Sequence, residues 1–161
     1  MSNLQKFGPQ VKGDQMAPTF QLKTIKDQTI KLWEYKQRKS LVIYFLPEPN
    51  DSLFADLQEN YPAYKTLQTE LIVIVTHWEA GLAERERRVG GLDYPVISNL
   101  DPTLYKRYLN LTGVVDIDNG LPAALFITDR YGAIVRYALD DLPPQTEILA
   151  VLEYLNILCN P

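Results

Sequence analysis

The sequence predicts an α/β fold with a central mixed sheet flanked by helices and a β-hairpin ahead of the sheet. Residues 41–46 and 71–75 are apolar throughout and rich in strand formers, as expected for strands that are covered on both faces. Residues 52–67 lie between them with apolar side chains at helical spacing, so the two strands are expected to be parallel. Residues 129–132 have the composition of a tight turn between two further strands, which predicts an antiparallel hairpin.

The N-terminal part of the chain is expected to be an arm followed by a hairpin. Residues 1–10 are polar and contain a Gly-Pro break, so we assign them to an arm and residues 11–161 to a single domain. The segments 19–22 and 29–32 alternate between polar and apolar residues on either side of a turn-like sequence, which is typical of a β-hairpin. A short helical turn is expected between this hairpin and the first core strand.

A long helix is expected after the first core strand. Asp51 can cap it, with the helix beginning at Ser52. Pro62 falls inside the helical pattern, and it predicts a kink or a break because proline removes a backbone hydrogen bond. The apolar stripe of this helix consists of Leu53, Phe54, Leu57, Tyr61, Tyr64 and Leu67.

Breakers and capping residues delimit the remaining elements. A polar helix is expected over residues 79–89, and the two glycines that follow are expected to end it. Residues 94–98 are expected to form a short peripheral strand, and an Asp-Pro pair opens a helix over residues 101–111. A last amphipathic helix is expected after the two prolines at 143–144, and it closes the fold.

Composition restricts the classes of function. The chain has 161 residues, a net charge of -4 and no basic stripe, so neither nucleic acid nor an anionic membrane is expected as a partner. It contains one histidine and one cysteine, so zinc sites built from these residues are excluded and no metal or cofactor is expected. A single cysteine cannot form an internal disulfide, and the first residues contain no apolar run. We therefore expect a cytoplasmic protein.

Four segments resemble motifs of the peroxiredoxin (alkyl hydroperoxide reductase / thiol-specific antioxidant) family, which has a thioredoxin-like fold. They are GDQMAPTFQL at 13–22, KSLVIYFLP at 39–47, YPVISN at 94–99 and LPAALFITDRYG at 121–132. They occur in the order and spacing of the family, and the resemblance covers most of the chain. It implies a thioredoxin-like fold and, by family, an antioxidant oxidoreductase that reduces peroxides with a cysteine thiolate.

The resemblance fails at the catalytic motif. In the family, a proline is followed four positions later by a threonine and seven positions later by the nucleophilic cysteine. Counting from Pro47 places Asp51 at the threonine position and Phe54 at the cysteine position, and the family's arginine falls near Ala123. Together with Pro122, these residues make up the degenerate active-site pocket that the resemblance implies, and no catalytic residue is expected there.

Pro122 matches the proline that precedes the central hairpin strand of thioredoxins, where it is cis and faces the active site. The resemblance therefore implies a cis peptide bond between Leu121 and Pro122. The alternative is a proline that only fixes the path of the chain into the strand. A cis bond before proline costs only about 0.5–1 kcal/mol, so the fold alone could retain it without a role in function.

Two classes of function are open at this point, and the sequence leaves undecided whether the chain is an enzyme. The first is a module that has lost thiol peroxidase chemistry and binds a protein or a small molecule at the former active-site pocket, or acts through a homodimer surface as the family implies. The second is an antioxidant oxidoreductase that uses Cys159, a partner's thiol or a bound cofactor. A third hypothesis is a small-molecule or peptide binder at a cleft beside Pro122.

Overall fold

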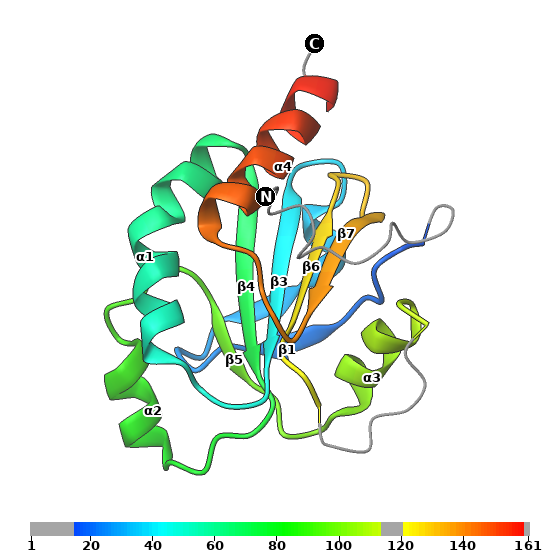
Figure 1. Ribbon diagram of the computed structural model, residues 1–161. Helices are drawn as coiled ribbons and strands as arrows, with labels where there is room; N and C mark the ends of the chain where they lie inside the picture. Colours follow the sequence, from blue (N-terminus) through cyan, green and yellow to red (C-terminus); the bar gives the residue numbers. More distant parts are fainter. Residues whose placement is uncertain (1–14, 114–120, 160–161) are drawn as a thin grey trace.

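The computed structural model describes residues 15–113 and 121–159 as a five-stranded mixed sheet with helices on both faces (Figure 1). The predicted N-terminal arm, residues 1–10, lies outside the described residues. The elements in chain order are β1 (Gln21–Lys23), β2 (Thr29–Lys31), the 3-10 helix η2 (Leu32–Tyr35), β3 (Ser40–Leu46), α1 (Asp51–Thr66), β4 (Thr69–Val75), α2 (Leu82–Val89), β5 (Val96–Ser98), α3 (Thr103–Asn110), β6 (Ala124–Thr128), β7 (Ile134–Leu139) and α4 (Gln145–Cys159).

The sheet has the strand order β5-β4-β3-β6-β7, and its strand directions are those expected from the sequence. β3 pairs with β4 in parallel and with β6 in antiparallel orientation. β5 is an edge strand parallel to β4, and β6 and β7 form the closing hairpin. The shorter hairpin of β1 and β2 stands apart as a two-stranded sheet. The predicted thioredoxin-like arrangement is confirmed.

Side chains of β3 alternate between two hydrophobic clusters, one on each face of the sheet. Val42 and Tyr44 face a cluster that contains the buried side chains of α1 and α4. Ile43 and Phe45 face a second cluster, which α3 and the β1–β2 hairpin cover. All four residues are completely buried. This double coverage explains why β3 is apolar from Leu41 to Leu46.

Three details of the helices differ from the sequence prediction. The cap of α1 is Asn50, whose side-chain oxygen accepts a hydrogen bond of 3.0 Å from the backbone N–H of Leu53, and Asp51 is already inside the helix. Both residue types can cap a helix, and only the backbone geometry decides between neighbours. Pro62 does not break α1, which is continuous to Thr66. The helix expected from residue 79 begins at Leu82.

The tight turn before β7 depends on two residues. Gly132 has a φ of +91°, a conformation that a side chain would strain. The carboxylate of Asp129 accepts hydrogen bonds of 2.9 Å and 3.0 Å from the backbone N–H groups of Tyr131 and Ala133. No helix in the described part of the chain is both long and apolar enough to cross a membrane.

Candidate functional site

The residues predicted to form the degenerate pocket lie near the point where β3 leaves the sheet and α1 begins. Pro47 follows the last residue of β3 and is half-buried, and Asp51 is exposed in the first turn of α1. Phe45 of β3 pairs with Ala124, the first residue of β6. Pro122 and Ala123 immediately precede that residue, so they approach the same end of the sheet at which Pro47 lies.

Phe54 lies in the first turn of α1, and its aromatic ring is buried. Its side chain is 2% exposed, and its ring stacks on that of Trp78, with centroids 6.2 Å apart and an interplanar angle of 30°. The hydroxyl of Tyr94 donates a hydrogen bond of 2.9 Å to the backbone carbonyl of Phe54. The position that the resemblance equates with the nucleophilic cysteine therefore belongs to the hydrophobic core.

Asp51 supplies a negative charge at the N-terminal end of α1, and Arg88 of α2 neutralises it. Both the Nη2 and the Nε of Arg88 contact Asp51 Oδ1, at 2.7 Å and 3.1 Å. The guanidinium also lies over the ring of Trp78, 5.4 Å from its centroid. A carboxylate at a helix N-terminus is stabilised by the helix dipole. The N-terminal end of α1 therefore carries a carboxylate of the chain itself, already paired with a guanidinium.

A second ion pair lies beside the first on α2. Arg87 donates hydrogen bonds of 2.5 Å and 3.0 Å to the carboxylate of Glu84, and this contact lowers the pKa of Glu84. The two pairs border an open, charged cleft over the start of α1. The residues that line this cleft are Asp51, Phe54, Ala55, Glu84, Arg87, Arg88 and Leu92.

The segment before β6 is held by hydrogen bonds to its backbone. The hydroxyl of Tyr105 donates to the carbonyl of Pro122, and the N–H of Asp140 donates to the carbonyl of Ala123 at 2.8 Å. Burial raises the pKa of the Tyr105 phenol, which keeps it protonated as a donor. No cis peptide bond occurs in the described residues, so the expectation of a cis bond before Pro122 is wrong. Trans is the ordinary state of such bonds.

Sequence reasoning missed the partners of the predicted site residues. Arg88 falls in the polar helix expected over residues 79–89, and the sequence assigned it no partner, whereas its neighbour Arg87 pairs within α2 with Glu84. Arg88 pairs with Asp51 across 37 positions of the chain. The sequence did not indicate that Trp78 packs at this site either. Trp78 lies in the connection after β4, and its burial depends on the packing of α1 and α2 around it.

The only cysteine of the chain is Cys159, the last residue of α4. Figure 1 shows that the C-terminal end of α4 projects from one end of the sheet, whereas the connection from β3 to α1 lies at the other end. The structure therefore does not bring Cys159 to the predicted pocket. No group of three histidine, cysteine or acidic side chains among the described residues could hold a metal ion.

Comparisons with known proteins agree with this architecture. The model of the AhpC/TSA family matches residues 14–137, so the chain belongs to that family. A search of curated proteins finds no match. Solved structures with the same fold include the reduced 2-Cys peroxiredoxin of Plasmodium vivax, which is 16% identical with a TM-score of 0.71 over 90% of this chain and 96% of that one.

Two further structures show how widely this fold is shared. The peroxidoxin BcpB of Mycobacterium tuberculosis is 13% identical with a TM-score of 0.67, over 95% of this chain and 97% of that one. A structure described as a thiol:disulfide interchange protein DsbE of Chlorobium tepidum is 16% identical with a TM-score of 0.60, over 92% and 98% of the two chains. At these identities the likeness establishes the thioredoxin fold only.

Proposed function

We propose that this member of the AhpC/TSA family has lost thiol peroxidase chemistry and acts as a binding or scaffolding module. The observation that carries the proposal is the burial of Phe54 at the start of α1, where the family resemblance places the nucleophile. A phenyl ring cannot attack the O–O bond of a peroxide. The Phe54 ring stacks on that of Trp78 in the hydrophobic core, so this position supplies packing and no nucleophile.

The electrostatics of the site support the same conclusion. A peroxidatic thiol must be ionised, and a helix N-terminus or a nearby cation lowers its pKa. In this chain the cation is Arg88, and it is already paired with Asp51. The carboxylate of Asp51 would repel a second anion at this position. The site is therefore electrostatically satisfied without a substrate, and no thiol stands in α1.

The charged cleft over α1 is the surface that we assign to binding. It carries charges of both signs, with Asp51 of α1 paired to Arg88 of α2 and Glu84 paired to Arg87 within α2. Mixed charges of this kind favour orientation and specificity in a protein partner rather than capture of a small ligand. Association of two copies of the chain is part of the proposal and follows from the family alone. The proposed cytoplasmic location rests on the single cysteine, which cannot form an internal disulfide.

An antioxidant oxidoreductase is the competing function, and membership of the AhpC/TSA family favours it. Such an enzyme would have to use Cys159 or a thiol from a partner. The Cys159 thiolate would attack one peroxide oxygen, breaking the O–O bond and releasing the other oxygen as hydroxide, which takes a proton to become water. Two molecules of added thiol would reduce the resulting sulfenic acid to the thiol and would leave as a disulfide, with release of water. The position of this residue at the end of α4, away from the β3–α1 connection, argues against catalysis within one chain.

Hydroperoxide consumption separates the two functions. The purified chain is incubated with hydrogen peroxide and a thiol reductant, next to a Cys159→Ser variant and a blank that contains the reductant only. We expect both proteins to match the blank. Turnover that the wild type shows and the variant lacks would assign the chemistry to Cys159 and overturn the proposal. Turnover in both proteins would point to a contaminating enzyme or to a bound cofactor, and a chelated and dialysed sample distinguishes these.

A further inference from the structure

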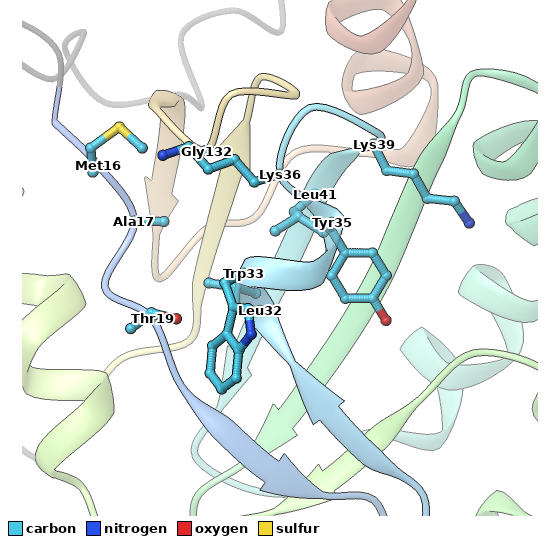
Figure 2. Close-up of a pocket in the computed structure, with 10 residues that line it drawn as sticks. All are labelled: Met16, Ala17, Thr19, Leu32, Trp33, Tyr35, Lys36, Lys39, Leu41 and Gly132. Carbon is cyan, nitrogen blue, oxygen red and sulfur yellow. The ribbon is translucent and has the colours of Figure 1, made fainter.

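A second hollow lies on the opposite face of the sheet from α1. It is a cavity of about 160 Å³ between the segment before β1, the helix η2 and the turn that joins β6 to β7 (Figure 2). Its floor consists of Leu32 and Leu41, which are 6% and 3% exposed and belong to the second hydrophobic cluster. It shares no lining residue with the charged cleft over α1.

Backbone hydrogen bonds fix the walls of this cavity. The N–H of Ala17 donates to the carbonyl of Gly132 at 2.9 Å, and the N–H of Leu32 donates to the carbonyl of Phe20 at 3.0 Å. These bonds tie the segment before β1 to the hairpin turn on one side and to η2 on the other. The cavity is therefore preorganised, and a ligand would not have to order the surrounding chain.

The rim of the cavity exposes large apolar side chains. Trp33 is 51% exposed and Met16 is 46% exposed, although both line the same cavity as the buried Leu32 and Leu41. Figure 2 shows the indole of Trp33 and the thioether of Met16 on opposite sides of the opening. An exposed apolar rim around an apolar hollow is typical of a ligand-binding site, because a monomeric protein otherwise buries such groups.

The charged side chains of the lining itself are basic, although burial and the nearby Glu70 and Glu34 raise the pKa of the lining residue Tyr35. The residues that line the cavity include Lys36 and Lys39 and no carboxylate. Lys39 has an acidic neighbour, with its Nζ 4.0 Å from Glu70, and Figure 2 shows its side chain pointing away from the other lining residues. Lys36 has no ion pair within the described residues, and its side chain extends toward Gly132. The cavity therefore offers an apolar floor and one available cation.

We propose that this cavity binds a small carboxylate with an aromatic or aliphatic body, independently of the function proposed for the α1 cleft. The body would rest on Leu32 and Leu41 beside the indole of Trp33, and the carboxylate would pair with the ammonium of Lys36. The size is appropriate, because an apolar cavity of about 150 Å³ accepts one benzene ring. A larger body would have to extend past Trp33 into solvent.

An NMR titration with 3-phenylpropionate tests the site directly. The two tryptophans of the chain provide separate indole N–H signals, of which Trp33 lies at the cavity and Trp78 on the other face. The neutral analogue 3-phenylpropanol keeps the ring and removes the charge. Lys36→Gln removes the cation, and Lys65→Gln on α1 is the matched control, because Lys65 does not line the cavity.

We expect 3-phenylpropionate to shift the Trp33 signal saturably and to leave the Trp78 signal unchanged. The alcohol should bind about three- to fivefold more weakly than the acid, as expected for one exposed charge pair. Lys36→Gln should abolish this preference, and Lys65→Gln should preserve it. The proposal is wrong if the acid gives no saturable shift at Trp33, if acid and alcohol bind equally to the wild type, or if Lys36→Gln retains the preference.

Discussion

Replacement of Phe54 by alanine should destabilise the chain by about 3–5 kcal/mol, the range found for truncation of buried aromatic residues. The ring is 2% exposed, so nearly all of its transfer free energy is lost, about 1.5–3 kcal/mol. The variant also loses the stacked contact with Trp78, with centroids 6.2 Å apart, which contributes about 0.5–1.5 kcal/mol beyond burial. The remainder comes from the cavity that the missing ring leaves between α1 and the sheet.

Urea denaturation followed by far-UV circular dichroism measures this change, and Phe54→Leu is the matched control. Leucine retains most of the buried volume and should cost less than about 1.5 kcal/mol. The hydrogen bond from Tyr94 goes to the backbone carbonyl of Phe54, so both variants keep it. A cost below about 1 kcal/mol for Phe54→Ala would show that the ring is not packed, and the argument for a filled pocket would fail.

Three further predictions concern the elements around the site. Asp51→Asn and Arg88→Gln should each change the free energy of unfolding by less than about 1 kcal/mol, because Asp51 is 71% exposed. A double-mutant cycle of these two substitutions should give a coupling energy that is smaller in high salt than in low salt. Pro62→Ala should raise the unfolding free energy by about 1–3 kcal/mol, since proline interrupts the hydrogen bonding of α1, and a loss of stability in urea would refute this. Burial, with Glu70 and Glu34 nearby, raises the pKa of Tyr35 from 10.0 to about 12. As the pH rises, the unfolded chain therefore loses this proton before the folded chain does, and the free energy of unfolding should fall from pH 10 to pH 12. Tyr35→Phe should reduce that fall, and an unchanged pH profile would contradict the prediction.

The fold could be predicted because its signals are local and periodic. The apolar runs of β3 and β4 indicate strands that are buried on both faces of a sheet, and the apolar side chains at helical spacing in α1 indicate a helix with one buried face. Boundaries were less predictable. Asn50 and Asp51 are both good capping residues, and adjacent positions carry nearly the same signal.

The candidate site was only partly predictable, because its contacts join distant segments. Counting along the family motif identified Phe54 and Asp51. Nothing in the sequence indicated that Trp78 would stack on Phe54 or that Arg88 would pair with Asp51. The cavity beside Trp33 was not anticipated. Three segments form its walls, and only the folded backbone brings them together.

The prolines show a further limit of local reasoning. Pro62 predicted a kink or a break, yet α1 continues through it, because the buried side chains of Tyr61 and Tyr64 on either side anchor the helix to the sheet. Tertiary packing thus overrides a local propensity. The cis bond expected before Pro122 rested on the family resemblance alone, and the structure has no cis bond among its described residues.

The most direct test of the central claim is the rate at which Cys159 reacts with hydrogen peroxide in a single turnover. Intact-mass spectrometry after trapping of the sulfenic acid gives this rate without any reductant, and the same chain unfolded in urea provides the rate of an ordinary thiol. We expect the folded chain to react no faster than the unfolded one, because the C-terminal end of α4 and the connection from β3 to α1 lie at opposite ends of the sheet. A folded-state rate a hundredfold or more above the unfolded rate would show an activated cysteine, and the chain would then be a peroxidase after all.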